Sequence, residues 1–204
     1  MAEIPSEEEV IRFGEVTKRE FKEKLGCNLD DVEIIYQPDC GIGGTSYVDE
    51  GISYIHGRTY QKTITHELEH HAFFRALTEK YGEDEAIRIM CLNPELREGL
   101  SEVVALEEML GIYDETTLIV VEEQKKRLLN SHHLEYNYPY EKYAYSPLTY
   151  ARGYATCSSL RKAFSDFAEM QRFLINDVPD LVHISDTASL LERLWPQNGP
   201  PPTK

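Results

Sequence analysis

The sequence is poor in cysteine, and its cysteines lack the spacing that a zinc-thiolate site or a disulfide framework requires. Only four occur among 204 residues, and no two of them form a Cys-x-x-Cys pair. We therefore expect reduced thiols and predict no cysteine-based metal site. The four are Cys27, Cys40, Cys91 and Cys157.

Long apolar runs are also absent, and positive charge is scarce. No segment approaches the roughly 18 apolar residues of a membrane span, and residues 1–10 lack the basic and apolar regions of a secretion signal. The sequence has 36 acidic residues and 21 Lys and Arg, so its formal net charge is −15. This charge disfavours binding to the phosphate backbone of a nucleic acid. The sequence predicts a cytoplasmic protein with neither a membrane nor a nucleic-acid partner.

The chain is long enough for one sizeable core, since single domains commonly have about 100–200 residues. Apolar residues make up 41% of the sequence, which is enough to form such a core. We predict one domain over residues 1–196, with an N-terminal lobe of about residues 1–80 and a helical lobe over residues 81–196. Residues 197–204 form a proline-rich tail.

The N-terminal lobe combines one helix with short strands. Ser6 and Glu9 form a capping box, apolar residues recur at helical spacing, and Gly26 ends the run. Three β-prone segments bounded by turn residues then predict a small sheet, antiparallel where a hairpin closes. These segments are residues 32–36, 45–48 and 52–55.

From Thr63 onward the sequence predicts one helix after another, with a tyrosine-rich loop at residues 136–145. The fold class is therefore α+β and mainly helical, with a histidine-rich helix at the junction of the two lobes. The predicted helices cover residues 63–80, 83–91, 94–110, 114–129, 148–173 and 187–195.

The histidine-rich helix reads HELEH from His66 to His70, which matches the HExxH pattern. Residues four apart lie on one helix face, so both imidazoles can bind one ion. Glu67 lies about 100° round the helix and can reach a water on that ion. A zinc hydrolase requires such a pair of nitrogen ligands and a carboxylate that accepts the proton of the water. The alternative is a chance match on an acidic helix.

Two histidines do not hold zinc alone, so a third ligand decides the class of site. A metzincin would need a histidine ten residues after His66, where the chain has Ala76. Glu98 and Glu102, in REGLSE, stand out because they lie one turn apart on a predicted helix. Glu98 can ligate the ion, and Glu102 can accept the free N–H of a ligand histidine. The other acidic candidates are Glu79, Glu83, Glu85, Glu95, Glu107 and Glu108.

These motifs resemble those of the gluzincins, the HExxH metallopeptidases that include the thermolysin-like proteases and the zinc aminopeptidases. In that group the ligand glutamate lies on a later helix, often before glycine or alanine, with a second acid four residues on. Glu98-Gly99 and Glu102 fit both features. The resemblance implies a zincin-like fold with one Zn²⁺ held by His66, His70 and Glu98. It also implies that Glu102 supports the site by accepting a hydrogen bond from a ligand histidine.

The segment YSPLTYARG, residues 145–153, resembles an aminopeptidase segment in which a tyrosine before a glycine stabilises the oxyanion. Tyr150 and Tyr145 occupy the two tyrosine positions of that segment. His132, or its neighbour His133, is an alternative oxyanion donor. The aminopeptidase signature Gly-x-Met-Glu-Asn is absent, so recognition of a free N-terminus is not implied. Residues 71–97 exceed the usual spacing and indicate an inserted turn or short helix.

Three further expectations concern the surroundings of this helix. His71 points about 100° away from His70 and is expected to pack inside the protein or to support a ligand. Glu69 is expected to be solvated. The predicted strand Gly51 to Ile55 lies directly before the histidine-rich helix. In enzymes of this group, that position in the chain is occupied by an edge strand that aligns an extended peptide.

The resulting hypothesis is a zinc metallopeptidase that hydrolyses extended or unfolded peptide substrates, with Glu67 as general base and Tyr150 beside the oxyanion. The rival is a non-catalytic zinc-binding module that works by binding a partner. A third possibility is an enzyme kept latent because the loop at residues 136–145 or the proline-rich tail occupies the cleft. The substrate, the choice between endo- and exopeptidase action and the oligomeric state stay open.

Overall fold

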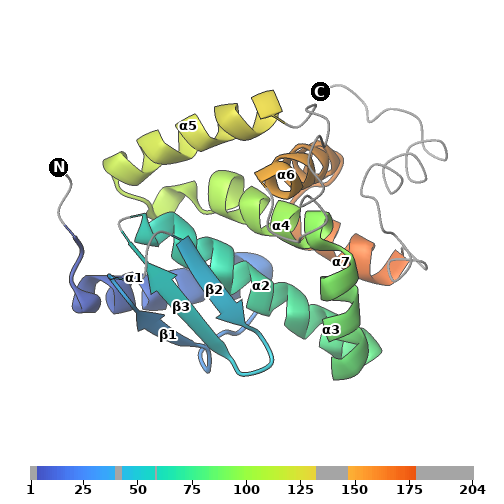
Figure 1. The fold of residues 1–204 in the computed structure, drawn as a ribbon. Coiled ribbons are helices and arrows are strands. Elements are labelled where there is room, and N and C mark those ends of the chain that lie inside the picture. Colours follow the sequence, from blue (N-terminus) through green and yellow to red (C-terminus); the bar gives the residue numbers. More distant parts are fainter. Residues whose placement is uncertain (1–3, 40–42, 58, 132–146, 178–204) are drawn as a thin grey trace, which may run out of the picture.

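The computed structural model describes residues 4–39, 43–57, 59–131 and 147–177 (Figure 1). Within these ranges the protein is mainly helical, with one small sheet, which agrees with the predicted α+β class. Its buried apolar residues form one cluster that runs from Val10 on the first helix to Ile175 on the last described one. The predicted helix at residues 187–195 and the tail lie outside the described residues.

The first helix, α1 (Glu7–Glu20), begins at the capping box that the sequence predicts. The hydroxyl of Ser6 accepts a bond from the backbone N–H of Glu9, and the Glu9 carboxylate bonds the backbone N–H of Ser6. A π-helical turn, η1 (Phe21–Leu25), completes the element. Gly26 follows with φ +68°, a left-handed conformation that glycine adopts without a steric penalty.

The sheet contains β1 (Glu33–Tyr36), β2 (Gly43–Tyr47) and β3 (Ile52–His56) in the order β1-β3-β2. The β2–β3 hairpin is antiparallel as predicted, whereas β1 pairs with β3 in parallel. The prediction that residues 51–55 form the edge strand is therefore wrong. β3 lies in the centre with Ser53 and Ile55 fully buried, and β2 is the edge strand beside the histidine-rich helix.

That helix, α2 (Tyr60–Tyr81), begins three residues before the predicted start and runs beneath β2 and β3. Its apolar face is buried in the core as the helical spacing predicts. α2 thus joins the sheet on one side to the later helices on the other. The core residues of this face are Ile64, Leu68, Ala72, Phe73 and Leu77.

The helices that follow are α3 (Glu83–Leu92), α4 (Pro94–Val103), η2 (Val104–Glu108), η3 (Leu110–Ile112) and α5 (Glu115–Ser131). α4 begins with proline at its first position, where the missing N–H costs nothing. The segment predicted as one helix over residues 94–110 changes at Val104 to a π-helical turn and then to a 3₁₀ turn.

The last described helices are α6 (Pro147–Arg161) and α7 (Phe167–Asp177). The prediction of a single helix over residues 148–173 is wrong, because residues 162–166 form a turn that separates α6 from α7. The Asp166 carboxylate accepts the backbone N–H of Glu169 at 2.7 Å, as an N-cap does, and therefore starts a new helix. This break lets α7 turn back and pack against α2.

α4 and α6 pack closely because each has a glycine at the crossing. A Cβ at Gly153 would overlap the backbone oxygen of Glu95, and a Cβ at Gly99 would overlap the backbone of Gly153. This approach brings Tyr150 on α6 beside Glu98 on α4.

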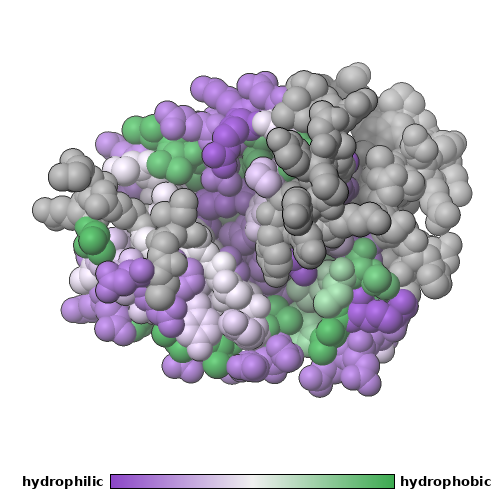
Figure 2. All heavy atoms as spheres, in the orientation of Figure 1, coloured by the Kyte–Doolittle hydropathy of each residue, from purple (hydrophilic) through white to green (hydrophobic). Residues whose placement is uncertain are grey.

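Apolar residues on the face shown in Figure 2 form small groups among hydrophilic ones. One group lies over α3, where Ile87 and Leu92 are exposed. Among the described residues, no helix is both long enough and apolar enough to cross a membrane.

Candidate metal centre

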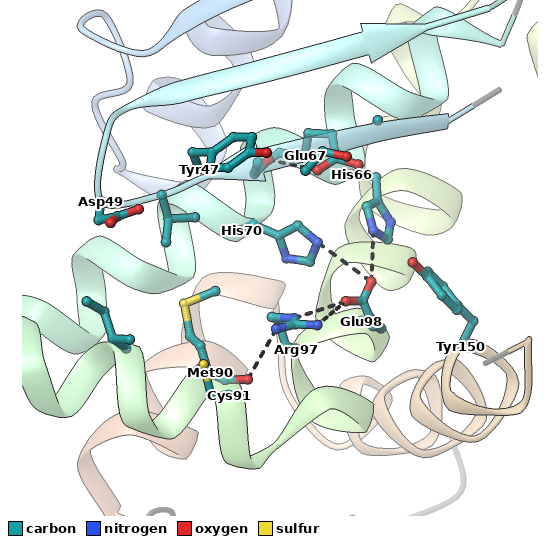
Figure 3. A pocket seen from close by; sticks show the side chains of 15 residues that line it. Tyr47, Asp49, His66, Glu67, His70, Met90, Cys91, Arg97, Glu98 and Tyr150 are labelled. Atoms are coloured by element: carbon teal, nitrogen blue, oxygen red, sulfur yellow. Dashed lines mark hydrogen bonds and ion pairs between the residues drawn. The ribbon is translucent and has the colours of Figure 1, made fainter. Parts of the chain in front are cut away.

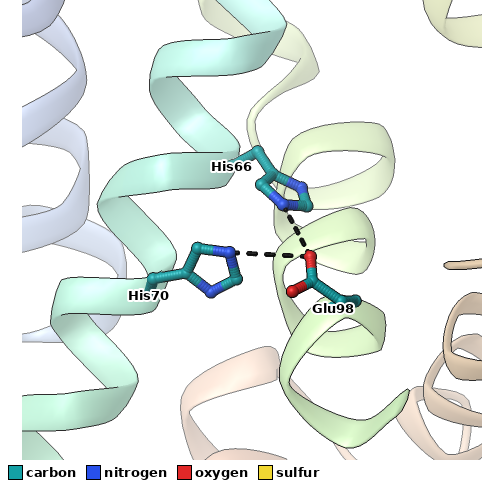
Figure 4. Close-up of side chains that lie close together, drawn as sticks. All are labelled: His66, His70 and Glu98. Carbon is teal, nitrogen blue, oxygen red and sulfur yellow. Dashed lines mark hydrogen bonds and ion pairs between the residues drawn. The ribbon is translucent and has the colours of Figure 1, made fainter. Parts of the chain in front are cut away.

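Three predicted ligands meet between α2 and α4. His66 and His70 project from successive turns of α2, and Glu98 projects from the first half of α4 (Figure 4). Glu98 Oε2 lies 3.1 Å from His66 Nε2 and 3.6 Å from His70 Nε2. All three side chains are buried, and their ligand atoms lie within 4.8 Å of one another. The structure thus brings together three groups that could hold a metal ion.

The spacing of these atoms suits a small divalent ion. Ligand atoms in a tetrahedral zinc site with bonds of about 2.0–2.1 Å are separated by about 3.3 Å. The separations of 3.1 and 3.6 Å between Glu98 Oε2 and the two histidine nitrogens lie on either side of this value. Two imidazole nitrogens and one carboxylate oxygen also form the donor set of many catalytic zinc sites, which keep a fourth position for water or substrate.

Glu102 lies directly behind His66. Its Oε1 atom is 3.2 Å from His66 Nδ1, which is within ion-pair distance although the alignment falls short of a hydrogen bond. Lys62 Nζ donates to the same oxygen at 2.6 Å, and Gln124 Nε2 donates to Oε2 at 3.2 Å. Glu102 is therefore fixed by charged and polar neighbours in the position from which it orients His66.

His70 and Glu98 have supports of their own. His70 Nδ1 lies 3.0 Å from Ser101 Oγ, so an Nδ1–H donated to Ser101 leaves Nε2 free for a metal. Arg97 donates from Nε and Nη2 to Glu98 Oε1 at 2.9 and 2.7 Å. The guanidinium engages one carboxylate oxygen and leaves Oε2 directed toward the histidines.

The electrostatics of the metal-free cluster favour charged acids and one charged histidine. Burial lowers the pKa of His66, but its contacts with Glu102 and Glu98 outweigh burial and raise that pKa to about 9. Burial lowers the pKa of His70 to about 3. Burial raises the pKa of Glu98, but the nearby histidines and Arg97 outweigh it and hold the pKa well below its usual range. At neutral pH, a metal would therefore displace a proton from His66.

Glu67 faces the same cleft from the adjoining position on α2. Burial raises its pKa above the usual value for a carboxylic acid, whereas the charge of His66 and a bond from Ser46 act in the opposite direction. Ser46, on the edge strand β2, donates to Glu67 Oε2 at 2.7 Å. A carboxylate with a raised pKa is suited to accept a proton near neutral pH.

Tyr150 closes the cluster from the side of α6. Its ring is stacked on His66 with centroids 5.9 Å apart, and it lines the same cleft as Glu98 and Glu67 (Figure 3). Burial and the nearby carboxylates raise the pKa of the phenol far above its usual value. Tyr150 therefore keeps its proton and can donate a hydrogen bond.

These side chains open into a cleft of about 560 Å³, which is within the usual range for ligand sites. One wall is the edge strand β2 together with Val48 and Asp49 of the following turn. The opposite wall includes Ile87 and Met90 of α3, the helix in the stretch that the sequence marked as an insertion. The candidate ligands thus lie at the bottom of an open cleft.

The other predicted residues have different positions. Tyr145, His132 and His133 lie outside the described residues, as does the loop at residues 136–145. His71 is buried and its Nε2 lies 3.0 Å from Ser53 Oγ, which agrees with a packed position.

The expectation that Glu69 is solvated is wrong. Its side chain is fully buried, because α7 packs across this part of α2 and Gln171 donates to Glu69 Oε1 at 2.9 Å. Burial raises the pKa of Glu69 well above its usual value. Burial therefore favours the protonated form of Glu69, which lies on the side of α2 that faces α7.

The sequence did not identify the residues that support the ligands, namely Lys62, Arg97, Ser101 and Ser46. Ser101 could have been inferred, because it follows Glu98 by three positions and so shares its helix face. Arg97 is adjacent to Glu98 in the sequence, but adjacency alone does not predict a contact. Lys62 and Ser46 reach the site only through the packing of α2 against α4 and β2.

Comparisons with protein-family models, with curated proteins and with solved structures give no match for this chain. The conclusions about its activity therefore depend on the geometry of the site.

Proposed function

We propose that the protein is a zinc-dependent metallopeptidase with a zincin-like catalytic core of the gluzincin type. The observation that carries this proposal is the arrangement of His66, His70 and Glu98 at the bottom of an open cleft that Glu67 also faces. A structural zinc site usually has four protein ligands and needs no neighbouring base. Three clustered candidate ligands beside a cleft-facing carboxylate support a catalytic site over the rival zinc-binding module.

His66, His70 and Glu98 would hold the zinc ion, which would serve as a Lewis acid and lower the pKa of the attacking water. Glu67 accepts the proton of the attacking water and passes it to the amine that leaves. Its raised pKa suits both steps, because the group must take up a proton and then release it. The phenol of Tyr150 donates a hydrogen bond to the carbonyl oxygen of the scissile bond, which gains negative charge during the attack.

The substrate is an extended peptide or an unfolded protein. β2 is the edge strand of the sheet and lines the cleft, so its free backbone groups can pair with a peptide segment. Pairing to an edge strand selects backbone conformation before side chains, which favours unstructured chains.

The test is hydrolysis of an unfolded protein such as reduced casein by zinc-loaded protein and by Glu67→Gln. We expect Glu67→Gln to bind zinc as the wild type does and to lose at least about 10²-fold in kcat, as expected when a general base is removed. Glu79→Gln, an exposed substitution on the same helix, is the matched control and keeps wild-type turnover. Equal turnover by Glu67→Gln, or no hydrolysis by the wild type, contradicts the proposal.

A further inference from the structure

The edge strand β2 contacts the side chain of Glu67 through one hydroxyl. Ser46 Oγ lies 2.7 Å from Glu67 Oε2, 3.0 Å from the backbone oxygen of Glu67 and 3.2 Å from Ser53 Oγ. Ser53 Oγ in turn lies 3.0 Å from His71 Nε2. These contacts connect Glu67 on α2 with both strands of the hairpin and then with α2 again, one turn further on.

The direction of these hydrogen bonds follows from the donors available. The ring of His71 also bonds the backbone of Ile52, a contact that favours an N–H donor on that side of the ring. In a neutral imidazole this leaves Nε2 as an acceptor, so Ser53 donates its single hydrogen to His71. Ser53 is then only an acceptor toward Ser46. The one hydrogen of Ser46 therefore has three acceptors within reach, and we assign it to Glu67 Oε2, a carboxylate oxygen and the shortest of the three contacts.

The backbone of β2 adds a second restraint on the same side chain. A Cβ at Gly44 would lie 2.7 Å from Glu67 Cγ and 2.8 Å from both Glu67 Oε1 and Thr63 Cγ2. The strand therefore fits against the stem of Glu67, and a side chain at this position would displace it. Gly44 limits where the stem can lie, and Ser46 fixes how the carboxylate is turned.

We infer that Ser46 is a positioning residue that holds the Glu67 carboxylate in its proton-transfer orientation, so that the strand proposed to align the peptide also orients the base. This inference depends on the proposed peptidase function. A glutamate at the wall of an open cleft has several rotamers, and small misplacements of a catalytic group cost large factors in rate. Ser46 engages Oε2, which leaves Oε1 to take the proton of the water.

The experiment compares zinc-loaded wild type, Ser46→Ala and Ser46→Thr with an unstructured peptide substrate. We expect Ser46→Ala to lower kcat by roughly tenfold to hundredfold, with zinc content unchanged and KM changed by less than about twofold. Ser46→Thr, which keeps the hydroxyl, restores most of the lost kcat. Ser6→Ala is the matched control, because it removes a hydroxyl–carboxylate bond of the same 2.7 Å length at the N-cap of α1, and Ser6 does not line the cleft.

A second comparison separates positioning from a general loss of stability. In a Glu67→Asp background the shorter side chain no longer reaches Ser46, so adding Ser46→Ala produces little further loss of kcat. Equal losses in the two backgrounds, or wild-type kcat in Ser46→Ala, overturn the inference while leaving the peptidase proposal intact.

Crystal structures of zinc-loaded wild type and Ser46→Ala decide the same question without activity. The inference predicts that the Glu67 carboxylate leaves its wild-type orientation in Ser46→Ala and keeps it in Ser46→Thr. An unchanged carboxylate in Ser46→Ala contradicts the inference. If the wild type hydrolyses no peptide, the proposed function fails, and these structures still determine whether Ser46 orients Glu67.

Discussion

At the scale of single residues, each candidate ligand contacts a supporting neighbour through one atom and another candidate ligand through a second atom. Arg97 engages Oε1 of Glu98, Ser101 engages Nδ1 of His70, and the atoms left over face one point. Such supports reduce the conformational cost of binding an ion, because the ligands need little rearrangement. The resulting preorganisation leads to predictions for Glu98 and His66.

Replacing Glu98 removes one of the three candidate ligands. We expect Glu98→Ala to weaken zinc affinity by at least about hundredfold, because loss of even a supporting residue typically costs 10–100-fold. Competition with a chromophoric chelator measures the affinity, and circular dichroism establishes that the variant is folded. Glu123→Ala, an exposed acid on α5, is the control and keeps wild-type affinity. Equal affinity in Glu98→Ala would direct attention to Glu102 as the third ligand.

Metal binding is coupled to the protonation of His66. The pKa of His66 is raised to about 9 from a usual 6.5, so its ion pairs stabilise the metal-free fold below about pH 6.5, and this stabilisation is lost as the pH rises through 9. We therefore expect zinc binding at pH 7.5 to release a proton from His66, and zinc affinity to rise with pH across this window.

Titration calorimetry in buffers of different ionisation enthalpy counts the released protons. Glu102→Gln removes a partner that raises the pKa of His66, so we expect this variant to release measurably fewer protons per zinc at pH 7.5. A zinc-bound water can also lose a proton. The protonation of His66 is therefore measured by the difference in protons released per zinc between the wild type and Glu102→Gln. Identical proton release by both would contradict the protonated His66.

Sequence patterns identified the reactive residues better than their supports. His66, Glu67 and His70 follow from helical spacing, and Glu98 follows from a motif on another helix; the structure brings the four side chains into one cleft. The contacts of Lys62 and Ser46 depend on how α2 packs against other elements, and the sequence has no local signal for such packing. The burial of Glu69 was missed for the same reason.

At the scale of elements, the site depends on the close packing of α4 against α6. Helices and the hairpin could be predicted because their periodicity and caps are local features. The central position of β3 could not, because parallel pairing with β1 joins strands separated along the chain. The break at residues 162–166 was missed because apolar spacing continues across it, although Asp166 has the chemistry of an N-cap.

The α4–α6 crossing predicts a cost for any side chain at Gly153. Gly153→Ala places a Cβ against the backbone of Glu95 and Gly99, so the free energy of unfolding should fall by about 2–3 kcal/mol. Urea unfolding measures this change. Gly111→Ala is the control, because a Cβ there meets nothing within 4 Å and stability should change by less than about 0.5 kcal/mol. Similar stability of the two variants would contradict close packing at the crossing.

At the scale of the whole molecule, the sheet and the helical part meet at the candidate metal centre. β2 supplies one wall of the cleft, α2 supplies His66, Glu67 and His70, and α4 and α6 supply Glu98 and Tyr150. An ion at this junction would connect α2 with α4, so its binding free energy would add to the stability of the folded chain. The described residues thus form a cleft whose chemistry depends on both parts.

We propose that His66, His70 and Glu98 hold one zinc ion, with a fourth position open toward Glu67. A crystal structure of the zinc-loaded protein, with anomalous data on both sides of the zinc absorption edge, tests it most directly. We expect one peak within about 2.0–2.2 Å of His66 Nε2, His70 Nε2 and a Glu98 oxygen, with no fourth protein ligand. A peak elsewhere, or a site closed by a fourth protein ligand, would rule out this catalytic zinc site.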